Sequence, residues 1–161
     1  MDFISDKRIL IGNDHGGYES KVKIAEHLRE KGYEVIDVGS ENTEIVRYPN
    51  YVKKVAGPIS KGEQTKGILI CSTGIGMCIA ANKYKGIRAA QVNSHYAAKM
   101  TRQHNDSNIL CLGGKTTGLF ELLDYVDTWL ENEYEGGRHA ISLGLIDEIE
   151  ENLGIKTPTE D

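Results

Sequence analysis

The stretch Gly67-Ile-Leu-Ile-Cys71-Ser-Thr-Gly-Ile-Gly76 decides the fold. Its first five residues form an unbroken apolar run, which predicts a strand buried on both faces. Gly74 and Gly76 then predict a tight turn, and helical spacing from there to about Lys83 indicates a helix. A buried strand that leads through a glycine turn into a helix is the building unit of a parallel α/β sheet.

The same unit recurs in both directions along the chain. Strands are predicted at 8–12, 34–38, 67–71, 88–92 and 108–112, and helices after 17, at 51–59, 74–83, 95–103 and 119–131, and after 136. This alternation predicts a single α/β domain over 1–161, a three-layer Rossmann-like sandwich with a five-stranded parallel sheet and an extra C-terminal helix. Its tail is expected to be frayed from about 154. Such sheets bind ligands at the carboxyl ends of their strands, where strand order reverses.

Composition narrows the function further. The 161 residues are 39% hydrophobic and 27% charged, which is typical of a globular domain. A formal charge of -5 disfavours broad binding to nucleic acid or to anionic membranes, because both require a basic face. Acidic residues in the last stretch, including Glu160 and Asp161, are interpreted as a solvated helix face and tail.

Localisation and metal binding can be judged from the apolar runs and the cysteines. No apolar run is long enough for a signal peptide or a membrane span, so we expect a cytoplasmic protein. The three cysteines are odd in number and form no C-x-x-C pair, which predicts free thiols and no zinc site. We expect Cys78 and Cys111 to serve packing.

The turn from Cys71 to Gly76 is the main candidate site. Its backbone N–H groups lie at the positive end of a helix and can hold an anion. A thiolate at this position would be stabilised in the same way, so Cys71 is a candidate base or nucleophile. The alternative is that Cys71 is a small hydrophobic core residue.

Three familiar phosphate-binding loops do not fit this chain. Ile79 stands where a dinucleotide fingerprint needs its third glycine, and Ile109 stands where a Walker loop ending at Gly114-Lys115 needs its first. A cysteine phosphatase needs an arginine soon after the nucleophile, but none occurs between Cys71 and Lys83.

Other polar groups lie near strand ends. Asp14-His15 follows the first strand and could move protons, although Asp14 could equally be a helix N-cap. His104-Asn105-Asp106 precedes the fifth strand, so the carboxyl-end rule does not place it in the same site, and it could be an ordinary turn. Tyr48 could line a pocket or form a turn. The Gly136–His139 segment carries two adjacent cationic donors.

Five blocks in order resemble the family of ribose-5-phosphate isomerase B and its galactose-6-phosphate isomerase relatives. They are Gly12–Gly17, Glu34–Gly39, Ile70–Gly76 continued by Ala80–Lys83, Arg102–Asp106 and Glu135–His139. The resemblance implies interconversion of ribose 5-phosphate and ribulose 5-phosphate, a step of the pentose phosphate pathway, through an enediolate and without cofactor or metal. It also implies a homodimer or tetramer whose active site lies at the subunit interface.

The resemblance also implies roles for individual residues. Cys71 would be the base, and Thr73 and His104 with Asp14 would assist ring opening and oxygen protonation. The substrate-binding residues would be His15, Tyr48, Ser72, Gly74, Ile75, Gly76, Asn105, Lys115, Arg138, His139 and Ser142. Within this set, His15, Lys115, Arg138 and Ser142 with His139 would hold the phosphate, and the N–H groups of residues 74–76 with the Asn105 amide would stabilise the enediolate.

Three positions depart from the family pattern. Relatives commonly have arginine where this chain has Lys115 and Ser142, and many have aspartate where it has Arg47. Lysine lacks the two-pronged geometry of arginine, so the preferred substrate could instead be allose 6-phosphate, galactose 6-phosphate or a tetrose phosphate. A non-catalytic phosphosugar-binding domain is a further alternative, although binding alone would not require Cys71, Asp14 and His104 together.

Overall fold

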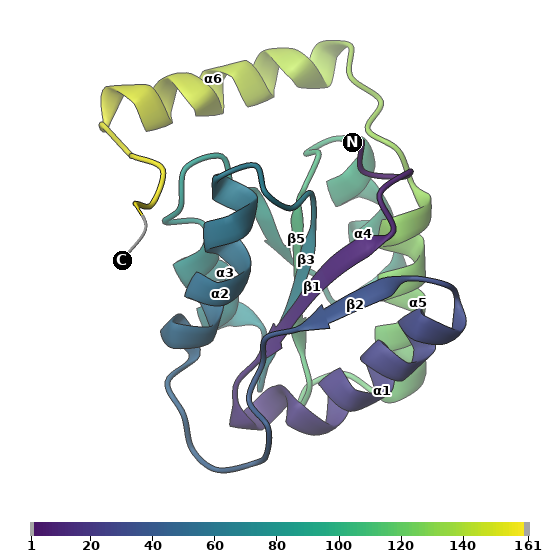
Figure 1. The fold of residues 1–161 in the computed structure, drawn as a ribbon. Coiled ribbons are helices and arrows are strands. Elements are labelled where there is room, and N and C mark those ends of the chain that lie inside the picture. The colour runs from purple at the N-terminus through teal and green to yellow at the C-terminus, as the bar shows by residue number, and fades with distance from the viewer. Residues whose placement is uncertain (1, 160–161) are drawn as a thin grey trace.

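The computed structural model describes residues 2–159, in which strands and helices alternate (Figure 1). The strands are β1 (Arg8–Asn13), β2 (Glu34–Asp37), β3 (Gly67–Cys71), β4 (Ala89–Gln91) and β5 (Ile109–Gly113). The α-helices are α1 (Tyr18–Glu30), α2 (Tyr48–Ser60), α3 (Ile75–Ala81), α4 (His95–Gln103), α5 (Leu119–Glu131) and α6 (Arg138–Asn152), and a 3-10 turn, η1 (His15–Gly17), precedes α1. The predicted order of elements is confirmed.

The sheet is parallel throughout and has the strand order β2-β1-β3-β5-β4. After β2 the chain crosses β1 and continues on its other side with β3. The direction of strand order therefore reverses between β1 and β3. The carboxyl ends of these two strands, at Asn13 and Cys71, form the crevice at which a doubly wound sheet binds its ligand.

Alternate residues of each strand point to opposite faces of the sheet, and both faces are covered. Ile68 and Ile70 belong to a core cluster with residues of α1, α4 and α5. Leu69 and Cys71 belong to a second cluster with residues of α2 and α3. Figure 1 shows α1 and α5 on one side of the sheet and α2 and α3 on the other. The predicted three-layer α/β sandwich is thus confirmed.

The start of α2 differs from the prediction. We expected a loop through Tyr48 and Pro49 before a helix at 51, but the helix begins at Tyr48 with Pro49 in its first turn. Proline is tolerated there because the first N–H groups of a helix have no intrahelical partner. The earlier start places the Tyr48 ring against Gly76, where a Cβ would lie 2.9 Å from its Cζ atom.

The C-terminal helix α6 lies apart from the three layers, across the end of the sheet (Figure 1). None of its residues is buried, and Ile141, Leu145 and Ile149 are 70%, 56% and 56% exposed. The Glu150 carboxylate accepts the Gly86 N–H at 3.0 and 3.1 Å, which ties the helix to the body. Glu160 and Asp161, predicted to belong to a frayed tail, lie outside residues 2–159. No helix within those residues combines the length and hydropathy needed to cross a membrane.

Candidate active site

Cys71 and Asp14 meet at the point where strand order reverses. The Asp14 N–H donates to the Ile70 carbonyl oxygen at 3.2 Å, which fixes the two strand ends side by side. Both residues are only 6% exposed. Cys71 packs in the core cluster beneath α2 and α3, but its sulfur accepts the Gly74 N–H at 3.1 Å. The sulfur therefore faces the glycine turn that the sequence singled out as an anion site.

The Asp14 side chain also has a structural role. Its Oδ1 atom accepts the Gly16 N–H at 2.9 Å and caps the 3-10 turn η1. The helix-cap interpretation is thus correct for this oxygen. It does not remove Asp14 from the crevice, because the cap holds the carboxylate at the end of β1, beside Cys71.

The turn after Cys71 is closely packed and partly satisfies itself. Gly74 has a φ of +77°, and a Cβ there would lie 2.9 Å from the Leu112 carbonyl carbon. The Ile75 N–H donates to Thr73 Oγ1 at 3.2 Å, and the Gly74 N–H is taken by the Cys71 sulfur. Two of the three N–H groups expected to stabilise an enediolate are therefore engaged within the turn. The third, the Gly76 N–H, lies in the first turn of α3, where N–H groups have no partner within the helix and can bind a ligand.

A small anion-sized cavity lies next to this turn. It has a volume of about 160 Å³, and His15, Gly16, Thr43, Gly114 and Lys115 contribute to its lining, together with Glu19 and Ser20. The Gly114 N–H donates to the Cys71 carbonyl oxygen at 2.8 Å, and the Lys115 N–H donates to that of Ser72 at 3.0 Å. These bonds hold the Lys115 backbone against the carboxyl end of β3, and His15 lines the same cavity as Lys115.

The other predicted site residues lie at the opposite edge of the sheet. His104 is the C-cap of α4 and Asn105 follows it, just before β5 begins. The neighbouring Asn108 carbonyl oxygen accepts the N–H of Gly67, the first residue of β3, whereas Cys71 is its last. Four strand steps of about 3.3 Å separate these levels by roughly 13 Å. A single chain therefore does not bring His104 and Asn105 to Cys71.

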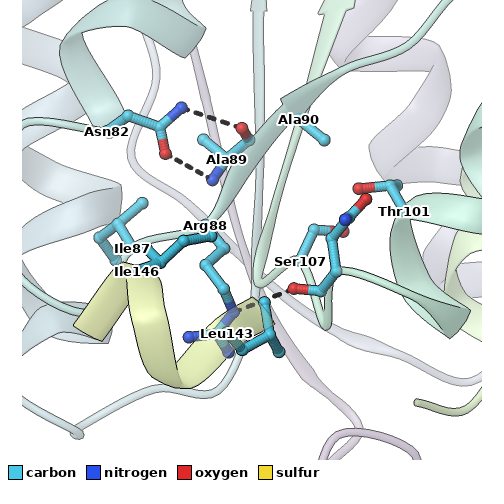
Figure 2. A pocket seen from close by; sticks show the side chains of 10 residues that line it. Asn82, Ile87, Arg88, Ala89, Ala90, Thr101, Ser107, Leu143 and Ile146 are labelled. Carbon is cyan, nitrogen blue, oxygen red and sulfur yellow. Dashed lines mark hydrogen bonds between the residues drawn. The ribbon is translucent and has the colours of Figure 1, made fainter. Parts of the chain in front are cut away.

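Arg138, His139 and Ser142 belong to this second group, because they occupy the first turns of α6. The His139 ring stacks on the His104 ring with centroids 4.0 Å apart. Figure 2 shows Arg88 beside Leu143 and Ile146 of α6 in a pocket of about 260 Å³. Asn105 also lines this pocket. The predicted site is thus divided into a thiol half at the carboxyl ends of the strands and a histidine half beneath α6.

Among residues 2–159, His104, Glu135 and His139 form the group with metal-ligand character, since their donor atoms lie within 4.8 Å of one another. Glu135 Oε2 lies 3.9 Å from His104 Nε2 and 3.8 Å from His139 Nε2. The two rings are inclined by only 15° and stacked 4.0 Å apart, so their nitrogen lone pairs lie in separate, nearly parallel planes rather than pointing at one shared position. The geometry is that of two stacked imidazoles sharing a carboxylate.

A pair of thiols lies on the same face of the sheet as Cys71. A hydrogen bond with Cys111 lowers the pKa of Cys78 to about 6, against the opposing effect of burial and with help from the Gln91 backbone and the Asn82 amide. Burial, followed by the hydrogen bond with Cys78, raises the pKa of Cys111 well above its usual 9.0. The sequence predicted only packing for these residues, because nothing in their spacing reveals that a helix and a strand bring them together.

Other contacts around the site were also missed. Gln91 Nε2 donates to the Thr73 carbonyl oxygen at 3.2 Å, and the Val46 N–H donates to His15 Nδ1 at 3.2 Å. Neither contact has a sequence signal, because each joins segments that are far apart along the chain. Spacing along the sequence could predict only that Thr73 and His15 follow the ends of strands.

Comparison with known proteins shows which family the chain is similar to. Residues 9–146 match the family model described as Ribose/Galactose Isomerase. The chain is 46% identical over 145 residues to ribose-5-phosphate isomerase B of Escherichia coli, covering 90% of this chain and 97% of the relative.

Solved structures show the same likeness. Ribose-5-phosphate isomerase B of Clostridium thermocellum superposes with a TM-score of 0.89 at 53% identity, covering 91% of this chain and 99% of that chain. The enzyme of Mycoplasma genitalium with bound ribulose-5-phosphate gives a TM-score of 0.86 at 39% identity, with coverage of 89% and 96%.

The doubly wound fold and these comparisons together define an α/β sugar isomerase, with a cysteine at the switch point of its sheet. The chain belongs to the ribose/galactose isomerase family.

Proposed function

We propose that this protein interconverts ribose 5-phosphate and ribulose 5-phosphate, with Cys71 as the base. The observation that carries the proposal is the Cys71 sulfur at the carboxyl end of β3, where strand order reverses, together with a cavity at the same edge of the sheet that His15 and Lys115 line. A phosphate held in that cavity would leave the carbonyl end of an opened pentose within reach of the sulfur. The named activity of the relatives supports the same reaction.

The reaction needs only proton transfers. The deprotonated Cys71 sulfur takes the proton from C2 of the open aldose, and the electron pair moves to form an enediolate with the C1 oxygen. The proton on O2 is transferred to O1, and the proton held by Cys71, or one exchanged with water, is delivered to C1 while O2 becomes the carbonyl oxygen. The Gly76 N–H can stabilise the intermediate negative charge, and a donor used in this way contributes about 3 kcal/mol to the barrier reduction.

A second copy of the chain completes the site in this proposal. His104, Asn105, Arg138, His139 and Ser142 lie at the wrong edge of their own sheet, so they serve the crevice of the partner. Exposed apolar residues of α6 give such a partner a surface to cover, since Ile141, Leu145 and Ile149 are all more than half exposed. From the partner, Arg138 would add charge to the phosphate pocket, and His104 would act with Asp14 in ring opening.

Lys115 and Ser142 bear on which sugar phosphate is preferred. Lys115 is exposed at the rim of the cavity and offers a single point charge, and Ser142 offers only a hydroxyl group. We therefore expect a weaker hold on the phosphate than two arginines would give, with the pentose still preferred. The cytoplasm is the proposed location, because all three cysteines are free thiols.

The test is a panel of aldose phosphates with four, five and six carbons, assayed with EDTA present. The expected result is the highest kcat/KM with ribose 5-phosphate and undiminished rates in EDTA. A higher kcat/KM with a six-carbon or four-carbon substrate would assign a different sugar phosphate. Binding of every sugar phosphate without turnover would instead indicate a phosphosugar-binding domain.

A further inference from the structure

We propose that Lys21 is a positioning residue for substrate binding, acting through the loop that fixes the ring of His15. The inference rests on the proposed function, in which His15 holds the substrate phosphate. Lys21 does not line the cavity beside Cys71, so its effect has to pass through other residues. The path runs from α1 through the end of β2 to residue 46.

The first step is the orientation of His15. Its Nδ1 atom accepts the Val46 N–H at 3.2 Å. A ring nitrogen that accepts a hydrogen bond carries no proton, so the ring hydrogen lies on Nε2. His15 therefore presents an Nε2–H donor to a bound phosphate. Without the Val46 contact, the ring could flip or change tautomer and present a lone pair, which repels a phosphate oxygen.

The second step is that the loop carrying Val46 has little support of its own. Residues 41–45 and 47 are exposed, and Ile45 is 80% exposed. Apolar packing therefore does not hold this loop in place. Inside it, the Glu44 N–H donates to Asn42 Oδ1 at 2.9 Å, which shapes the turn but does not attach it to the body.

Lys21 anchors the start of the loop, at Ser40. Lys21 is 4% exposed, and its Nζ donates to Asp37 Oδ2 at 2.8 Å and to the Ser40 carbonyl oxygen at 3.0 Å. A buried ammonium group is costly unless it is paired, and these two bonds pair it while joining α1 to the loop. The Tyr18 ring, 5.0 Å from the same ammonium, completes its surroundings.

Hydrogen bonds from Asn13 also connect Ser40, where the loop begins, to the crevice. The Asn13 side chain is fully buried, and its Nδ2 donates to Ser40 Oγ and to the Asp14 carbonyl oxygen, both at 2.8 Å. The Ser40 hydroxyl in turn donates to the Asn42 carbonyl oxygen at 3.1 Å. Ser40 is therefore held from both sides, by Lys21 through its carbonyl group and by Asn13 through its hydroxyl group.

The test compares Lys21→Met with the wild type. Methionine keeps the apolar stem and removes the ammonium group, so the loop loses its charged anchor. We expect KM for ribose 5-phosphate to rise about tenfold, the effect of losing one good hydrogen bond, while kcat stays within about twofold because binding rather than the chemical step is weakened. Lys21→Arg should restore most of the affinity, and Lys53→Met, at an exposed position on α2, should leave KM unchanged.

A second readout separates positioning from general damage. Long-range 1H–15N spectra of the His15 ring should show the Nε2–H form in the wild type and a mixture of tautomers in Lys21→Met. Should Lys21→Met fail to fold, Lys21→Gln carries the test, because glutamine stays polar but is too short to reach both Asp37 and Ser40. A folded variant with an unchanged His15 tautomer and unchanged KM would overturn the inference.

The tautomer measurement does not need turnover. If ribose 5-phosphate is not a substrate but the His15 ring of Lys21→Met shows a mixture of tautomers, the proposed function is wrong and the positioning role of Lys21 is supported. If ribose 5-phosphate is turned over but Lys21→Met changes neither KM nor the His15 tautomer, only the positioning role of Lys21 is wrong.

Discussion

Substituting Gly74 by alanine tests whether the turn after Cys71 has the packing described above. Gly74 has a φ of +77°, in the left-handed region that costs a residue with a Cβ about 1 to 2 kcal/mol. The added Cβ would also lie 2.9, 3.0 and 3.1 Å from the carbonyl carbon, oxygen and nitrogen of Leu112, inside van der Waals contact. Leu112 lies in the buried strand β5, so it cannot move away cheaply, and overpacking of this kind costs a further 1 to 3 kcal/mol or so.

The expected loss in free energy of unfolding is therefore about 3 kcal/mol, equivalent to a fall in Tm of roughly 6 to 12 °C for a domain of this size. The matched control is Gly62→Ala, because Gly62 has a φ of +78° but no atom within 4 Å of its ideal Cβ position. Only the backbone term of about 1 to 2 kcal/mol remains there, or roughly 2 to 8 °C.

The two variants, Gly74→Ala and Gly62→Ala, should also differ in kcat. The turn in Gly74→Ala has to move, which displaces the N–H that now donates to the Cys71 sulfur at 3.1 Å, so kcat should fall about tenfold or more. Gly62→Ala should keep the wild-type kcat. Thermal unfolding and steady-state assays measure both effects. Equal melting temperatures for the two variants, with full activity in Gly74→Ala, would refute the reasoning.

Three further outcomes are expected. Cys71→Ala should abolish turnover while sugar-phosphate binding, measured by calorimetry, stays within a few fold; retained turnover would exclude the sulfur as base. Ser142→Arg should lower KM for ribose 5-phosphate several-fold by adding a two-pronged phosphate ligand, and an unchanged or raised KM would show that position 142 does not reach the phosphate. Burial opposes ionisation of Asp6, but hydrogen bonds from Arg8 and Thr65 lower its pKa from 3.8 to about 2, so its stabilisation is complete above pH 3.8 and is lost as pH falls towards 2. Asp6→Asn should therefore destabilise by on the order of 2 kcal/mol at pH 7 and by almost nothing at pH 2 in urea titrations; an equal loss at both pH values would contradict the assignment.

Much of the fold could be predicted because its signals are local. The apolar run at 67–71 is long enough for one buried strand and is followed directly by glycines, which is the pattern of a strand that exits into a helix. The same reasoning placed Asp14, His15, Ser72 and Lys115 beside Cys71, since all of them follow strands. The carboxyl ends of parallel strands meet at one edge, so this half of the site follows from spacing alone.

The histidine half of the site could not be placed from the sequence by this reasoning. His104 and Asn105 precede a strand, so within one chain they lie at the opposite edge of the sheet from Cys71, and their role depends on the proposed second chain. Lys21 looks like a solvated residue of an amphipathic helix, because its partners Asp37 and Ser40 come from a strand end and a loop. The bond from the Gly74 N–H to the Cys71 sulfur depends on the detailed path of the turn, which composition does not specify.

In the proposed active site, Cys71 of one chain acts together with His104 of another, and mixing inactive subunits tests this pairing directly. Cys71→Ala and His104→Ala proteins, each inactive alone, are unfolded together, refolded and assayed. Half of the refolded dimers should pair one variant with the other, and each such pair contains one intact site, so activity should recover to about a quarter of the wild-type value. Recovery of no activity from a mixture shown to contain mixed dimers would contradict a site shared between subunits.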